Sequence, residues 1–159
     1  MKRLFIAIFA MLAVVGAQAQ LPNFFPHEGK YSEFQEAINA DKSFSFVKET
    51  KAKSNSTIYS EWEGMYQGEL FSITINYSAL TNDILSVRMS ANVMSNTMRV
   101  FLDVADKMAE TIGRPEFYET NAYWDKYDIM MKVDGTEITI YYSNSVNKAI
   151  HEREIKRRQ

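Results

Sequence analysis

Cysteine is absent from this chain of 159 residues, and histidine, proline and glycine are scarce, with two, three and six residues. Without cysteine the chain can form no disulfide, thiolate zinc site or iron–sulfur cluster, and it has no cysteine nucleophile. The six glycines form no phosphate-binding loop and no dinucleotide-binding fingerprint. The sequence therefore predicts a fold held together by packing alone, with no cofactor.

The two histidines lie near opposite ends of the chain, His27 in an irregular lead-in and His151 in the C-terminal tail. A histidine-based catalytic triad needs its general base in an ordered position, and we expect neither segment to be ordered. Neither histidine has three ligands around it at the spacing of a metal site. We expect both to be solvated polar side chains, and we predict no catalytic residue and no metal site.

The first nineteen residues have the three-part layout of an export signal. Lys2 and Arg3 precede an apolar run over residues 4–15, and an Ala-Gln-Ala motif ends at Ala19. Twelve apolar residues span about 18 Å as a helix, which is too short for a hydrocarbon core of about 30 Å. The sequence predicts a cleaved signal peptide, a bacterial protein that is periplasmic or secreted, and no stable membrane anchor.

After the signal, residues 20–159 predict a single globular domain with a basic C-terminal tail. Residues 20–145 hold eleven Lys or Arg against eighteen Asp or Glu, whereas residues 146–159 hold five against two. An acidic body lacks the broad positive face that nucleic acid requires, so we predict no nucleic-acid partner. The tail begins with Val146, Ala149 and Ile150 at helical spacing and is expected to fray into a solvated end, although anionic lipid or cell-wall polymer could bind it.

Alternating apolar residues predict four strands in the first half of the domain. These residues are Phe44 and Phe46, then Ile58, Ser60 and Trp62, then Phe71, Ile73, Ile75 and Tyr77, then Leu85, Val87 and Met89. Their neighbours on the opposite face are largely polar, which is typical of an antiparallel sheet with one buried and one wet face. Gly64 and Gly68 are expected to mark one reversal of the chain, and residues 81–83 another.

The second half begins with an amphipathic helix over residues 97–112, the clearest element in the sequence. Apolar residues recur there at intervals of three and four residues, namely Met98, Phe101, Leu102, Ala105, Met108, Ala109 and Ile112. Ser95 or Asn96 can cap its start, and Gly113 followed by Pro115 ends it. Residues 117–124, 129–133 and 138–142 predict two or three further strands, with a type I′ hairpin turn at Asp134-Gly135.

Together these patterns predict an α+β domain with an antiparallel sheet of about six or seven strands. The long helix, at about residues 97–112, should pack on one face of the sheet. A short N-terminal helix should precede the strands, capped by Ser32 and Gln35 in a capping-box pattern.

Aromatic side chains are the feature that the predicted core uses least. Six such side chains lie near strand ends or on the face opposite the apolar one: Tyr59, Tyr66, Tyr118, Tyr123, Trp124 and Tyr141. Of these, we predict Tyr66, Tyr118, Tyr123 and Trp124 as binding residues. Tyrosine and tryptophan combine apolar area with a polar group, which suits a partner surface or a platform for sugars. We therefore predict a non-catalytic binding module of the cell envelope, whose partner is a protein, a small molecule or a glycan. Alternatively, the sheet packs on both faces, and the same aromatic residues then serve only to hold the fold together.

Two other functions remain open. Glu61 and Glu63 point to the same side of a predicted strand, about 7 Å apart, which is compatible with the carboxylate pair of an inverting glycosidase. This spacing also occurs on any wet strand face. A glycan- or cell-wall-directed hydrolase is therefore the first alternative, and a structural component of the envelope is the second.

Overall fold

The computed structural model describes residues 29–40, 43–53, 56–66 and 68–158, so the predicted signal peptide and His27 lie outside it. The described elements are α2 (Tyr31–Ala40), β1 (Phe44–Lys51), β2 (Thr57–Tyr66), β3 (Glu69–Ser78), β4 (Ile84–Asn92), α3 (Thr97–Ile112), β5 (Glu116–Tyr118), β6 (Asn121–Trp124), the 3₁₀ turn η1 (Asp125–Tyr127), β7 (Ile129–Asp134), β8 (Glu137–Ser143) and α4 (Ser145–Arg158). The predicted α+β class is confirmed.

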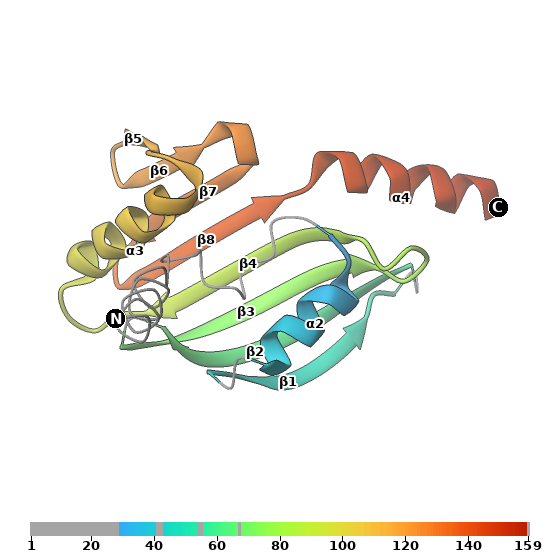
Figure 1. Cartoon of the computed structure of the whole chain (residues 1–159), viewed down its shortest axis with the longest axis horizontal. Coiled ribbons are helices and arrows are strands. Elements are labelled where there is room, and N and C mark those ends of the chain that lie inside the picture. Colours follow the sequence, from blue (N-terminus) through green and yellow to red (C-terminus); the bar gives the residue numbers. More distant parts are fainter. Residues whose placement is uncertain (1–28, 41–42, 54–55, 67, 159) are drawn as a thin grey trace, which may run out of the picture.

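All eight described strands form one antiparallel sheet in the order β1-β2-β3-β4-β8-β7-β6-β5 (Figure 1). The strand number exceeds the predicted six or seven because residues 116–124 form two strands. Glu119, with a positive φ of 53°, lies in the turn between them. Helix α2 packs beside β1, α3 packs on β7 and β8, and α4 continues from β8 past the end of the sheet.

The two halves of the chain have the same order of elements. Helix α2 precedes the meander β1–β4, and helix α3 precedes the meander β5–β8. The two meanders join where β4 pairs with β8 in the middle of the sheet. No repeat is visible in the sequence, because each half needs only an amphipathic helix and alternating strands, which many different residues supply.

The core lies between the sheet and the two helices α2 and α3. One cross-strand row of the helix-covered face shows it most clearly, since each member pairs with the next and all are at most 2% exposed: Trp62, Ile73, Met89, Ile140, Met131 and Ala122. Burial of large apolar side chains contributes roughly 1.5–3 kcal/mol each before entropy is subtracted. The predicted buried face is therefore confirmed, and none of the described helices lies over the centre of the opposite face.

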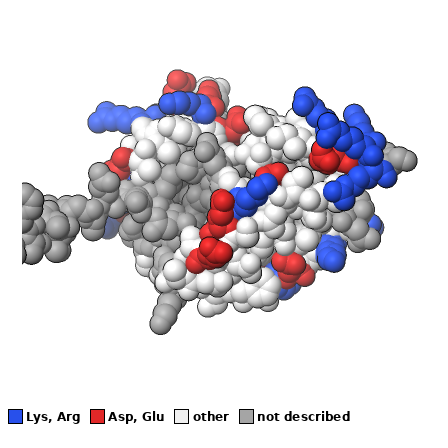
Figure 2. All heavy atoms as spheres, turned by 45° about the vertical axis from the view of Figure 1, so that its right-hand side comes forward, with Lys and Arg blue, Asp and Glu red and all other residues white. Residues whose placement is uncertain are grey.

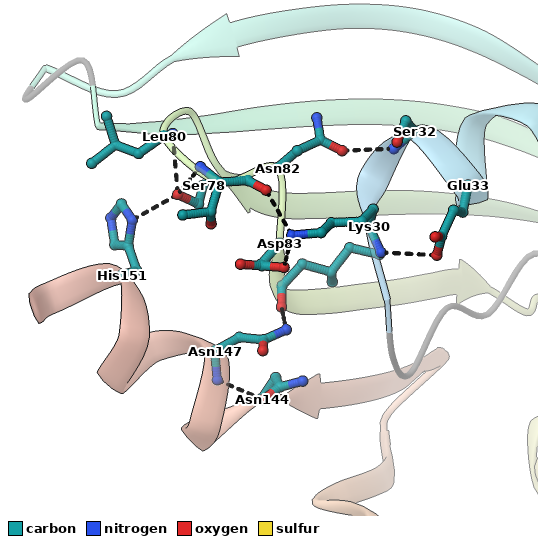
Figure 3. Close-up of polar contacts among 12 residues, drawn as sticks. Lys30, Ser32, Glu33, Ser78, Leu80, Asn82, Asp83, Asn144, Asn147 and His151 are labelled. Atoms are coloured by element: carbon teal, nitrogen blue, oxygen red, sulfur yellow. Dashed lines mark hydrogen bonds and ion pairs between the residues drawn. The ribbon is translucent and has the colours of Figure 1, made fainter. Parts of the chain in front are cut away.

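The start of α2 is held by the loop between β3 and β4 and not by the predicted Ser32 and Gln35. The carbonyl and side-chain oxygens of Asn82 accept the backbone N–H groups of Tyr31 and Ser32 (2.9 Å each), and Glu33 accepts that of Lys30 (Figure 3). Asn82 has a positive φ of 64°, which asparagine tolerates better than most residues. The prediction was wrong because the cap comes from a distant loop.

Helix α3 has the predicted bounds but a narrower buried face. Phe101, Val104, Ala105 and Met108 are buried, whereas Met98 and Leu102 are 46% and 45% exposed. Only the arc of the helix that touches β7 and β8 is covered, and Met98 and Leu102 lie on its flank. Gly113 ends the helix with a positive φ of 86°, as predicted, but Asn96 makes no side-chain cap bond.

Two predicted turns differ in detail. Gly64 lies inside β2, where an added Cβ would collide with the backbone carbonyl of Ser43 and stand 2.5 Å from Cγ of Phe44. This glycine therefore allows the backbone and the Phe44 ring of the neighbouring strand to approach, and it does not reverse the chain. Gly68, with φ 81°, lies in that reversal. The β7–β8 hairpin exists, but Gly135 is its only residue with positive φ, so it is not a type I′ turn, which needs two.

Candidate ligand-binding face of the sheet

The face of the sheet opposite α2 and α3, here called the open face, carries polar and aromatic side chains in cross-strand rows. Its longest row crosses all eight described strands, and each of the following residues pairs with the next: Lys48, Glu61, Thr74, Arg88, Tyr141, Met130, Tyr123 and Glu116. Directly opposed residues on neighbouring strands stand about 5 Å apart and touch one another. The row therefore places two tyrosines and a methionine beside a cation.

Two of the four predicted binding residues lie on the open face. Tyr123 is half-buried in the row, and Tyr118, 67% exposed, is its diagonal neighbour on the edge strand β5. Tyr141, 36% exposed, lies two strands further on, with Met130 between it and Tyr123. Tyr141 belongs to the six surplus aromatics but not to the four predicted binding residues, although Ile140 and Tyr142 on either side of it point toward the core.

The other two predicted residues lie on the helix-covered face. The Tyr66 ring packs against the buried Phe71, with ring centres 5.7 Å apart. Trp124 is 3% exposed, and its indole N–H donates to the Gly113 carbonyl oxygen (2.6 Å). In the alternation of their strands, both residues fall on the side that points toward the core. The four predicted aromatics thus do not form one platform, and Trp124 does not present its ring to a partner.

The charged groups of the open face are largely neutralised by one another. The guanidinium of Arg88 donates to Glu137 Oε1 (2.9 Å), which also accepts the Thr139 hydroxyl (3.2 Å). The Lys48 ammonium lies 3.4 Å from the Glu61 carboxylate. Because these pairs are partly exposed, each contributes at most about 1 kcal/mol to stability. Their effect is mainly to remove net charge from the surface.

Hydroxyl and amide groups occupy much of the rest of this face. A shallow hollow of about 270 Å³ lies over β2, β3, β4 and β8, and its lining includes Glu63, Leu70, Ser72, Ser90, Asn92 and Glu137. A second hollow of the same size lies at the end of β6, and its lining includes Ile112, Arg114, Tyr123, Trp124 and Lys126. Because Ile112 and Trp124 belong to the helix-covered side, this hollow is not part of the open face alone. The aromatic side chains of the open face lie toward its β5 end.

The two glutamates of the predicted carboxylate pair lie on the open face, as the alternation of β2 requires. Glu61 faces Lys48, and Glu63 borders the hollow together with Glu137. Glu63 is exposed to solvent. A hydrolase would use Glu63 with a second carboxylate. For Glu61 to be that carboxylate, its ion pair with Lys48 would have to break.

His151 is not the solvated side chain that the sequence predicts. It is 6% exposed, and its Nδ1 lies 2.9 Å from the hydroxyl oxygen of the fully buried Ser78 (Figure 3). The expected frayed tail is helical from Ser145 to Arg158, which carries His151 onto the end of β3. The same Ser78 oxygen accepts the backbone N–H groups of Leu80 and Thr81 (3.2 Å each). This pair fastens α4 to the sheet.

A second buried polar group lies under α2. The Tyr31 and Tyr77 rings stack with centres 4.0 Å apart, Tyr31 shares a hydrogen bond with Ser60 (2.6 Å), and Tyr77 donates to Glu49 (2.8 Å). Burial, followed by the Glu49 carboxylate, raises the pKa of Tyr77 above its ordinary value of 10.0. Both phenols are therefore hydrogen-bonded within the core, and Tyr77 is the donor in its bond to Glu49.

A larger hollow of about 380 Å³ lies where η1, β8 and α4 meet. Its lining includes Gly29, Lys126, Asp128, Asn144 and Val146.

Neither a metal site nor a membrane span is found among the described residues. No three His, Asp or Glu side chains there are close enough to hold an ion, and no helix there is long and apolar enough to cross a bilayer. The open face thus offers stacking and hydrogen bonding as its chemistry. The chain matches no protein-family model, and no curated protein or solved structure is significantly similar to it.

Proposed function

We propose that this protein is a non-catalytic binding module, exported to the bacterial envelope, whose open face holds an uncharged polar ligand. A glycan chain fits this surface best. The observation that carries the proposal is the row of Tyr123, Met130 and Tyr141, which continues into the paired charge of Arg88.

The tyrosines supply flat apolar area with a hydroxyl at the rim. Tyr123 and Tyr141 are two strands apart, about 10 Å, so an extended ligand lying across the strands can contact both. Tyr118 extends the same surface to the sheet edge. Tyrosine rings supply a large contact area to a ligand at a low cost in side-chain entropy.

The polar groups between the aromatics favour an uncharged ligand. Arg88 and Lys48 each have a carboxylate partner, so neither is a free cation that would attract an anion. Ser72, Thr74 and Ser90 lie at neighbouring positions of the same face. Hydroxyl and amide groups exchange hydrogen bonds with the hydroxyls of sugars without a cost for burying charge.

The test is binding of the purified protein to an immobilised panel of neutral and acidic glycans, followed by affinity measurements on the strongest neutral glycan. Tyr123→Ala and Tyr141→Ala should each weaken binding at least tenfold, as expected for aromatic anchors. Phe117→Ala is the matched control, because Phe117 is 55% exposed on β5 but faces the other side of the sheet. It should change the affinity less than twofold.

Three outcomes would contradict the proposal. One is that no neutral glycan binds, and another is that Phe117→Ala weakens binding as much as Tyr123→Ala. The third is turnover of the bound glycan that is lost in Glu63→Gln, which would establish the hydrolase alternative instead. Binding that is confined to protein partners would leave the open face as an interaction surface but refute the glycan as its ligand.

A further inference from the structure

Most residues of helix α4 are exposed to solvent. It leaves the end of β8 and extends past the edge of the sheet (Figure 1). Its attachments lie on one side, where Asn147 donates to the Ile84 carbonyl oxygen (2.9 Å) and His151 meets Ser78. The opposite side of the helix faces solvent over its whole length.

This outward side combines three apolar residues with a basic end. Val146 is 67% exposed, Ile150 is 39% exposed, and Ala149 lies between them at helical spacing. Residues seven and eleven positions after Val146, Arg153 and Arg157, lie on the same side of an α-helix. The outward side is therefore apolar in its first two turns and basic in its last two.

The charge of α4 is opposite to that of the rest of the protein. The helix contains five Lys or Arg and two Asp or Glu, and one of those acids, Glu154, pairs with Arg157 (2.7 Å). Residues 20–145 hold eleven basic against eighteen acidic residues. In Figure 2 the blue side chains gather most densely at the upper right, at the α4 end of the molecule.

We propose that α4 attaches the protein reversibly to the surface of an anionic lipid bilayer. Val146, Ala149 and Ile150 would enter the boundary between headgroups and acyl chains, and the basic side chains would contact anionic headgroups. Clusters of four to eight Lys or Arg beside a membrane are typical of attachment to anionic lipid.

The acidic body gives this attachment a direction. A helix of fourteen residues is about 21 Å long, which is roughly twice the distance over which charges are screened at 0.1 M salt. An anionic surface therefore attracts the exposed end of α4 and repels the body. Lipid is favoured over an acidic protein partner because α4 forms no groove, and flexible basic side chains on an isolated helix need no partner of matching shape.

This inference concerns a different surface from the proposed glycan site and does not depend on it. The experiment is co-sedimentation of the full purified protein with vesicles of phosphatidylcholine alone or with about one third phosphatidylglycerol. The wild-type protein should bind the anionic vesicles only, and raised salt should release it. The triple variant Arg153→Gln, Lys156→Gln, Arg157→Gln should bind about 100-fold more weakly, at about fivefold per basic side chain.

Two further variants separate lipid attachment from a general affinity for anions. Val146→Ser with Ile150→Ser should weaken vesicle binding about tenfold and should leave binding to soluble heparin unchanged. The matched control, Lys51→Gln, Lys53→Gln and Arg99→Gln, removes the same charge from exposed positions of the body and should leave vesicle binding within twofold.

The proposal is overturned if anionic vesicles do not bind the wild-type protein, or if the control triple variant loses as much affinity as the α4 triple variant. It is also overturned if the serine double variant binds vesicles as well as the wild type. Far-UV circular dichroism of each variant should match that of the wild type, so that loss of binding reports the surface and not the fold.

Discussion

The contact between Ser78 and His151 makes Ser78→Ala the most informative single change for the stability of this fold. Ser78 is fully buried, and its hydroxyl oxygen accepts two backbone N–H groups, those of Leu80 and Thr81. Both lone pairs are then used, so the hydroxyl hydrogen points to Nδ1 of His151, 2.9 Å away. One side chain therefore closes the β3–β4 turn and fastens α4.

Alanine at this position removes three hydrogen bonds at once. Each is worth about 1 kcal/mol net, and a buried ring nitrogen left without a donor adds a cost of about 1–3 kcal/mol. Because both N–H bonds are long, at 3.2 Å, we expect a total loss of about 3 kcal/mol in the free energy of unfolding, or roughly 10 °C in melting temperature. Urea and thermal unfolding followed by far-UV circular dichroism measure it.

A double-mutant cycle with His151→Leu then tests the pairing itself. Removing both partners leaves no unsatisfied group between them, so the double variant should be more stable than the sum of the single losses predicts, by about 1–2 kcal/mol. Ser145→Ala is the control, because its exposed hydroxyl makes only a 3.5 Å contact to Asp128. A loss below about 1 kcal/mol in Ser78→Ala, or additive losses in the cycle, would refute the reasoning.

Three further predictions concern single sites. Gly64→Ala forces Cβ into the Phe44 ring and should lower the free energy of unfolding in urea by about 3 kcal/mol or more. Gly68→Ala, where the space is open, should lose only about 1–2 kcal/mol through backbone strain. Similar losses in the two variants would contradict the packing role of Gly64. Burial disfavours the charged form of Asp83, but the Lys30 ammonium at 2.6 Å outweighs it and lowers the pKa below 3.8. This ion pair should therefore contribute about 1 kcal/mol to stability above pH 4, and this contribution is lost as the pH falls through the lowered pKa. The stability difference between the wild type and Asp83→Asn should then vanish at low pH. A difference that stays constant with pH would be contrary evidence. Trp124→Phe removes the bond to the Gly113 carbonyl and should destabilise by about 1–2 kcal/mol without affecting any ligand; a selective loss of binding would show that the ring is accessible.

Local patterns in the sequence predict the elements of this fold well. Alternation identifies β2, β3, β4 and β8 because each has one buried face, and the period of α3 gives its bounds together with Gly113. The patterns do not show which elements share the sheet centre. The pairing of β4 with β8, and hence the two-fold arrangement of helix and meander, depends on contacts between residues about fifty positions apart.

The same limit explains the errors at caps and at the C-terminus. Asn82 caps α2 from a loop fifty residues away, and no local signal in residues 30–35 points to it. His151 looks like part of a charged tail, since its burial depends on Ser78, seventy-three residues earlier. The short helix-forming stretch beginning at Val146 was the only local sign of α4.

The candidate site could be predicted only in part. The surplus of aromatics is visible in the sequence, and strict alternation separates Tyr123 and Tyr141, on the open face, from Trp124, which has core parity. Applying that parity would have excluded Trp124 and added Tyr141. The pairing of Arg88 with Glu137, which removes net charge from the face, depends on β8 lying beside β4 and could not be read from either segment alone.

The most direct test of the open face as the binding surface is a titration of the isotopically labelled protein with the strongest neutral glycan, followed by amide chemical shifts. The account predicts that the largest shifts fall on β4, β6, β7 and β8, around Arg88, Tyr123, Met130 and Tyr141. Shifts concentrated on α2 and α3, or at the hollow beside Val146, would contradict it.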